Sequence, residues 1–99
     1  MKIKPGANIQ GIDFKLRPVL IHADDIWKKY GQEVVVTAGM DGEHSASSLH
    51  YYGLAIDLRT SYFTPEIASS VRDELQAKLG RNFDIVLEKS HIHAEFDPK

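Results

Sequence analysis

The chain has 99 residues, contains no cysteine, carries little net charge and has no long hydrophobic run. The absence of cysteine excludes disulfide bonds and thiolate zinc sites, so a metal ion would have to be bound by imidazole and carboxylate groups. The formal net charge of −2 and the lack of a basic run argue against nucleic-acid binding, which needs clustered lysine and arginine side chains. No segment approaches the roughly 20 apolar residues of a membrane-spanning helix, so we expect no membrane span.

The N-terminal segment also lacks the features of a signal peptide. Residues 1–6 include charged side chains but are not followed by the apolar core that such a peptide requires. We therefore expect the protein to be made in the cytoplasm. A chain of this length supports one hydrophobic core, which predicts a single domain over residues 1–99, and we expect it to be a monomer.

Hydrophobic periodicity predicts two helices. From Pro18 the apolar residues fall at helical spacing, and Gly31 is suited to the C-terminal cap of this first helix. A second helix is predicted from Pro65, with Thr64 as its N-cap residue, up to Gly80.

The first 16 residues show no sustained periodicity and include proline and glycine. We expect them to form an arm that packs on the body of the domain through three apolar side chains, Ile9, Ile12 and Phe14.

Four segments favour β-structure. Residues 33–37 contain a run of valines, and residues 53–60 alternate between apolar and polar or small side chains. Residues 83–88 and 91–96 are short and close enough in sequence to form a terminal hairpin. These elements predict an α+β fold in which helices cover one face of an antiparallel sheet, while the other face is left open for a cleft.

The segment from residue 48 to residue 57, S-L-H-Y-Y-G-L-A-I-D, contains two candidate metal ligands, His50 and Asp57. Gly53 lies between them, and the backbone freedom of glycine would let the chain turn and bring the two side chains together. Two histidines and one carboxylate, with the fourth position left to water, form the ligand set of a catalytic zinc site.

A second pair of imidazoles, His91 and His93, lies in the last predicted strand. A period of two places both histidines and Glu95 on one face, which we expect to be the face of the cleft. A histidine that does not bind the metal would be available as an acid or base for metal-assisted hydrolysis, and Glu88 is the alternative base. Glu95 is either an acceptor that orients a metal-bound imidazole or a plain solvent-facing acid.

These residues resemble a known family. The sequence S-L-H-Y-Y-G-L-A-I-D followed by H-I-H is similar to the two-part signature of the zinc D-Ala-D-Ala metallopeptidases, which include lysostaphin-type enzymes, D-Ala-D-Ala carboxypeptidases and the hedgehog signalling domain. The resemblance covers roughly residues 17 to 96 and is strongest to hedgehog N-terminal domains and their bacterial relatives. It implies a hedgehog-like or D-Ala-D-Ala peptidase-like fold with a zinc cleft on the open face of the sheet.

The resemblance also implies roles for individual residues. It implies a Zn²⁺ ion held by His50, Asp57 and His93. It matches His44 with a family position that contacts the transition state. Glu88 is the nearest match to the catalytic glutamate of the family, and His91 is the alternative for that role.

The resemblance implies a hydrolase, namely a zinc-dependent metallopeptidase that cleaves an amide bond in peptidoglycan stem peptides, as a D-Ala-D-Ala carboxypeptidase or as an endopeptidase. Such a protein would act on the cell wall, for example as a phage or prophage lysis protein. The alternative is a non-catalytic, zinc-stabilised binding module of the hedgehog type. An iron(II) oxygenase uses the same ligand set, but the spacing between His50 and Asp57 argues against it.

Overall fold

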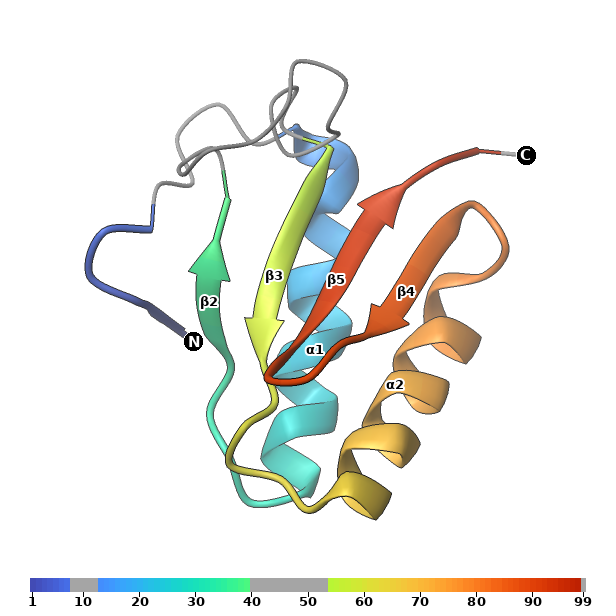
Figure 1. Cartoon of the computed structure of the whole chain (residues 1–99). Coiled ribbons are helices and arrows are strands. Elements are labelled where there is room, and N and C mark those ends of the chain that lie inside the picture. The colour runs from blue at the N-terminus through green and yellow to red at the C-terminus, as the bar shows by residue number, and fades with distance from the viewer. Residues whose placement is uncertain (8–12, 40–53, 99) are drawn as a thin grey trace.

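The computed structural model describes residues 1–7, 13–39 and 54–98. Within these ranges the chain forms a small α+β domain with a mixed sheet of five strands, in the order β1-β2-β3-β5-β4 (Figure 1). The elements in chain order are β1 (Lys2–Ile3), the 3-10 helix η1 (Phe14–Leu16), α1 (Arg17–Lys29), β2 (Val35–Ala38), β3 (Ala55–Arg59), α2 (Pro65–Leu79), β4 (Phe83–Leu87) and β5 (His91–Phe96).

The sheet is mixed, so the prediction of an antiparallel sheet is wrong for one strand pair. Strands β2 to β5 pair antiparallel, but β1 pairs with β2 in parallel. The Lys2 amide donates to the carbonyl oxygen of Val34 at 2.7 Å, and the Lys4 amide donates to that of Val36 at 2.9 Å. A strand of two residues is too short to show a period of two in the sequence, and it forms only because β2 offers it a free edge.

The expectation that Phe14 packs on the body of the domain is also wrong, because this side chain is 75 % exposed. The start of η1 is fixed by the Asp13 side chain, which accepts a hydrogen bond from the Lys15 amide at 2.9 Å. The turn that follows buries Leu16 instead. The N-terminal arm was also predicted to pack through Ile9 and Ile12, which lie outside the described residues.

Both predicted helices are confirmed. The Thr64 hydroxyl caps α2 by accepting a hydrogen bond from the Ile67 amide at 3.2 Å. Gly80 follows the last turn of this helix with a φ of 82°, in the region that glycine adopts without strain. Neither helix in the described ranges has the length and hydrophobicity that crossing a bilayer requires.

The predicted terminal hairpin is confirmed as β4 and β5, and the two earlier predicted strands are found as β2 and β3. In β3 the apolar side chains of Ile56 and Leu58 are buried, whereas Asp57 between them is only partly covered. The alternation in the sequence therefore predicts correctly which side chains face the core and which face away from it.

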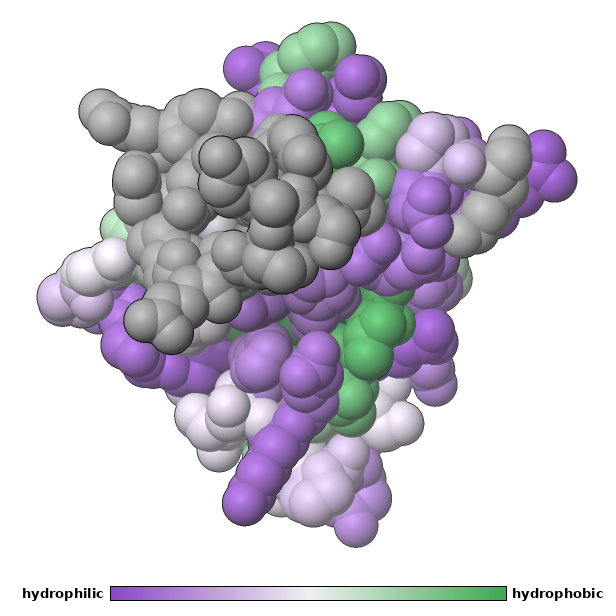
Figure 2. All heavy atoms as spheres, turned by 45° about the horizontal axis from the view of Figure 1, so that its top comes forward, coloured by the Kyte–Doolittle hydropathy of each residue, from purple (hydrophilic) through white to green (hydrophobic). Residues whose placement is uncertain are grey.

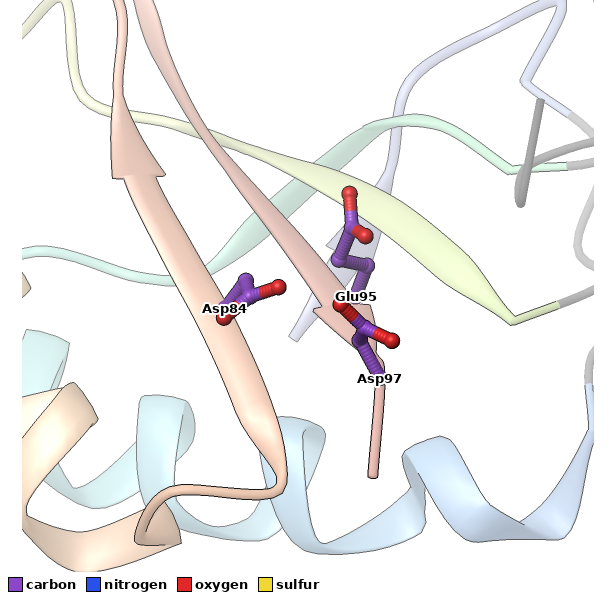
Figure 3. Close-up of side chains that lie close together, drawn as sticks. All are labelled: Asp84, Glu95 and Asp97. Carbon is purple, nitrogen blue, oxygen red and sulfur yellow. The ribbon is translucent and has the colours of Figure 1, made fainter. Parts of the chain in front are cut away.

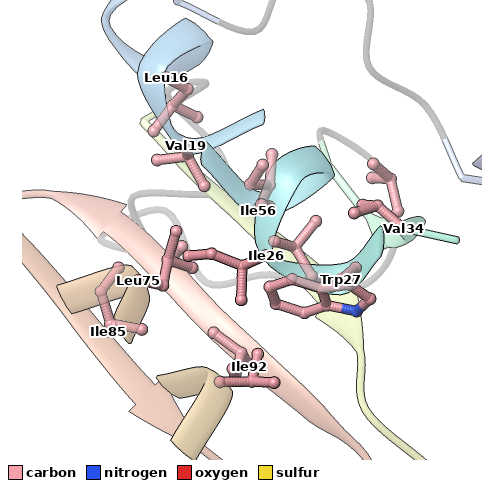
Figure 4. Close-up of a cluster of buried hydrophobic side chains, with 14 of the residues drawn as sticks. Leu16, Val19, Ile26, Trp27, Val34, Ile56, Leu75, Ile85 and Ile92 are labelled. Carbon is pink, nitrogen blue, oxygen red and sulfur yellow. The ribbon is translucent and has the colours of Figure 1, made fainter. Parts of the chain in front are cut away.

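The hydrophobic core lies between the sheet and the two helices, which cover the same face of the sheet (Figure 1). Trp27 of α1 is fully buried among the aliphatic side chains of both layers (Figure 4). Its indole N–H donates to the carbonyl oxygen of Arg59 at 3.0 Å. This contact joins α1 to the end of β3, the strand that carries Asp57.

The outer edge of β4 is covered by two side chains of α2. The side-chain amide of Gln76 donates to the carbonyl oxygen of Phe83 at 2.7 Å and accepts from the Ile85 amide at 3.2 Å. The Arg72 guanidinium donates to the carbonyl oxygen of Ile85 at 2.9 Å. The Phe83 carbonyl and the Ile85 amide and carbonyl thus point away from β5, and each of these three groups is hydrogen-bonded to a side chain of α2.

Candidate metal centre

Strands β3 and β5 bring several of the predicted site residues together on the face of the sheet opposite the helices. In their antiparallel register Asp57 is paired with His93, and Arg59 is paired with His91. Side chains of directly paired residues lie on the same face, with Cβ atoms about 5 Å apart. The register therefore places the imidazoles of His91 and His93 on either side of one carboxylate, that of Asp57.

Asp57 and His93 form a hydrogen-bonded pair whose atoms lie nearly as close together as two ligands of one zinc ion. The Asp57 Oδ1 atom lies 3.0 Å from His93 Nδ1. Two ligand atoms bound tetrahedrally to one zinc ion at about 2.0 Å lie about 3.3 Å apart. The two side chains therefore fit a shared zinc ion with little movement, and His93 would bind through Nδ1.

The other ring nitrogen of His93 is held by Glu95. Its Nε2 atom lies 2.8 Å from Glu95 Oε1. Glu95 thus occupies the place of an acceptor that orients a metal-bound imidazole, the first of the two roles considered for it. This contact leaves Nδ1 directed at Asp57.

His93 lies between two carboxylates that favour its charged form. The hydrogen bond that His93 donates to Asp57 raises the pKa of His93, burial of the ring opposes this effect, and the hydrogen bond that it donates to Glu95 adds to it, with the result that the pKa is about 9. With this pKa the His93 ring is an imidazolium at neutral pH, with each ring N–H directed at a carboxylate.

His91 lies between Asp57 and Glu88. Its Nε2 atom is 3.7 Å from Asp57 Oδ2 and 3.6 Å from Glu88 Oε2, and its Nδ1 atom is 3.4 Å from the Ser90 hydroxyl. His91 thus lies beside the predicted ligand Asp57, and Glu88 lies on the other side of His91. Both remain alternatives for the role of base. The two other predicted site residues, His44 and His50, lie outside the described residues.

An irregularity in strand pairing occurs next to Asp57. Val36 is paired with Leu58 but Ala38 with Asp57, so that Thr37 is an additional residue on β2. A bulge of this kind bends the strand and redirects side chains, and bulges are frequent beside active sites. The run of valines in this strand gave no sign of the bulge, because hydrophobic pattern does not report pairing.

Two adjacent pockets open at this part of the molecule. One, of about 380 Å³, is lined by Asp57 and His91 together with Arg59 and hydroxyl-bearing residues. The other, of about 450 Å³, has apolar walls that include Phe63 and Leu87. The two pockets share residues Ser61 and Ser90 in their linings.

A group of three carboxylates was not singled out in the sequence. Asp84 of β4 is paired with Glu95 of β5, and Asp97 follows this strand (Figure 3). One ligand atom from each lies within 4.8 Å of the others. The hairpin register brings the first two together, and only that register would have indicated the group. Acidic groups of this kind are common at protein surfaces without an ion, so the cluster alone assigns no metal.

The surface around these residues is mainly polar. Figure 2 shows that hydrophilic side chains prevail over the described surface in this view, with a small hydrophobic area between them. Val86, the β4 residue paired with His93, is 48 % exposed. Any molecule that binds here therefore meets charged groups with an apolar side chain beside them.

Comparison with models of known protein families and with curated proteins gives no match for this chain. The resemblance to zinc D-Ala-D-Ala metallopeptidases is thus a prediction based on the two motifs.

Proposed function

We propose that this protein is a zinc-dependent peptidase that hydrolyses an amide bond in peptidoglycan stem peptides. The observation that carries the proposal is the 3.0 Å separation of Asp57 Oδ1 and His93 Nδ1 on the open face of the sheet. His91 lies beside Asp57, and Glu88 lies beside His91, so that two candidate bases are near this pair. A role in cell-wall lysis, as in a phage or prophage, is part of the same proposal.

In this proposal Asp57 and His93 hold the ion, and the resemblance adds His50 as the third protein ligand. A bound Zn²⁺ would activate water and polarise the carbonyl of the substrate. Glu95 fixes the orientation of the His93 ring through Nε2, at 2.8 Å. Either His91 or Glu88 accepts the proton from the attacking water and then passes it to the leaving nitrogen.

Replacing the candidate bases tests the catalytic part of this proposal. Glu88→Gln and His91→Ala are expected to leave zinc bound, while the variant that removes the true base lowers kcat by about 10² to 10⁴. Mass spectrometry of muropeptides after digestion measures turnover, and elemental analysis measures zinc. Glu66→Gln, an exposed acid in the first turn of α2, is the matched control. Absence of cleavage by the zinc-loaded natural protein would contradict the proposal.

The second candidate is a non-catalytic, zinc-stabilised binding module of the hedgehog type. It is favoured by the distances of 3.7 and 3.6 Å from His91 Nε2 to its two carboxylate neighbours, which exceed hydrogen-bond length, so that neither carboxylate holds this nitrogen in the position of a base. If the protein is such a module, zinc should raise the stability of the fold and no muropeptide should be cleaved. Glu88→Gln should change neither the stabilisation by zinc nor the absence of cleavage.

The pH dependence of zinc affinity tests the role of His93. Its pKa of about 9 means that zinc must displace a proton from Nδ1 throughout the neutral range. Zinc affinity should therefore rise about tenfold per pH unit between pH 7 and 9 from this group alone, and the contribution should level off above its pKa. Competition with a chromogenic chelator at several pH values measures this slope.

Glu95→Gln provides the control for the pH dependence. Loss of the Glu95 charge removes one of the causes that raise the pKa of His93. The levelling should then occur at a lower pH than in the natural protein. An affinity that does not change between pH 7 and 9 would show that His93 is not a ligand.

A further inference from the structure

The pocket that contains Asp57 and His91 also contains two cationic residues. Arg59 comes from the end of β3 and Lys4 from the segment after β1. Among the residues that the structure describes, no ion pair joins either cationic side chain to a carboxylate. The described lining also includes three residues with hydroxyl groups, Thr37, Ser61 and Ser90.

This combination is suited to an anion. A guanidinium presents paired N–H donors that match the two oxygens of a carboxylate, and an ammonium adds a second positive charge. Hydroxyl groups supply further donors. Asp57 is the one acidic residue in the described lining, and its Oδ1 atom is already directed at His93. Within the described part of the chain no carboxylate neutralises these two positive charges by an ion pair, so they are suited to an anionic ligand.

The position of Arg59 relates this pocket to the candidate metal centre. Arg59 lies two residues after Asp57 and is paired with His91 in the sheet. Two residues along a strand span about 7 Å, which is also the length of two residues of an extended peptide. A carboxylate held by Arg59 would thus belong to a residue close to an amide bond positioned at Asp57.

We infer that Arg59 and Lys4 bind a carboxylate group of the peptide substrate, next to the bond that is cleaved. This inference rests on the proposed function. It makes Arg59 and Lys4 specificity-determining residues, and it restricts substrates to peptides with a free C-terminal carboxylate or an acidic side chain near the cleaved bond.

Binding of small molecules tests the carboxylate site without hydrolysis. The probes are N-acetylglycine and its neutral analogue N-acetylglycinamide, titrated into the full chain with and without zinc and followed by NMR. The acid should bind at least about tenfold more tightly than the amide, and Arg59→Gln should remove this preference. The preference should persist in the zinc-free protein, because it depends on the two cations.

The variant is expected to fold, because the Arg59 contact with Trp27 is made by its backbone oxygen. Thermal melting followed by circular dichroism checks this, and Arg59→Lys should restore part of the preference. Arg81→Gln, at an exposed position in the turn before β4, is the matched control and should behave like the natural protein. Equal binding of acid and amide, or an unchanged preference in folded Arg59→Gln, would overturn the inference.

Cleavage assays then identify the source of the carboxylate. Peptides are compared as free acids and C-terminal amides, and with an acidic side chain or its amide near the cleaved bond. A loss of at least about tenfold in kcat/KM on only one of these changes identifies the group that is bound. Cleavage that is insensitive to both changes and to Arg59→Gln overturns the inference but leaves the peptidase in place. If Arg59→Gln loses the preference for the acid but the natural protein cleaves no peptide, the carboxylate site is supported. Only the proposed peptidase activity is then contradicted.

Discussion

Asp57→Asn is expected to weaken zinc binding by more than about 100-fold, because replacing a residue that only orients a ligand already costs 10- to 100-fold. The amide keeps the shape of the side chain but lacks the charge that a carboxylate ligand provides. In the same variant the pKa of His93 should fall from about 9 towards its ordinary value, because the hydrogen bond that His93 donates to Asp57 is the largest cause of its rise. Chelator competition measures the first effect and NMR titration of the imidazole the second.

Asp84→Asn is the matched control for this experiment. Asp84 lies on the same face of the sheet, in the group with Glu95 and Asp97, and its replacement removes the same charge. We expect it to leave zinc affinity nearly unchanged. The opposite result, with weak binding in Asp84→Asn and normal binding in Asp57→Asn, would place the metal at the three carboxylates and contradict the proposed centre.

Trp27→Ala is expected to lower the free energy of unfolding by about 3 to 5 kcal/mol, the usual cost of removing a large aromatic side chain from a core. Trp27 has no exposed surface and lies between the helices and the sheet. Since small domains are stable by only about 5 to 15 kcal/mol, a large part of this variant should be unfolded in mild denaturant. Urea titration followed by far-ultraviolet circular dichroism measures the change.

Two variants separate the causes of this loss. Trp27→Phe keeps an aromatic ring but leaves the carbonyl oxygen of Arg59 without its donor, which should cost about 1 to 3 kcal/mol. Ile21→Ala removes an apolar side chain from the same helix at a position that is 54 % exposed, and should change stability by less than about 0.5 kcal/mol. A Trp27→Ala variant as stable as Ile21→Ala would show that α1 does not hold β3 in place.

The helices were predictable from the sequence because their signals are local. Thr64 and Gly80 mark the two ends of α2 within a few residues of the backbone groups that they serve. The short strand β1 was not predictable in the same way, because its pairing with β2 depends on residues more than 30 positions away. Phe14 was expected to be buried because it is apolar, but hydrophobicity does not state which side of a short helical turn faces the core.

The candidate site was also predictable from the sequence only in part. Alternation in β3 and β5 predicts that Asp57, His91 and His93 lie on the polar face. It does not predict that Asp57 is directly opposite His93 rather than His91, because this depends on the register of two strands that are far apart in sequence. The register also brings Asp84 to Glu95. Pairing between strands, and not the pattern within one strand, decides which side chains meet.

The hydrogen bonds from α2 to the edge of β4 restrict how another chain can approach. A sixth strand could add beside Phe83 and Ile85 only by displacing Gln76 and Arg72 from the backbone groups that they already occupy. A bound peptide would therefore not lengthen the sheet at this side unless these hydrogen bonds were broken. The same closure keeps two copies of the protein from joining through β4 into a continuous sheet.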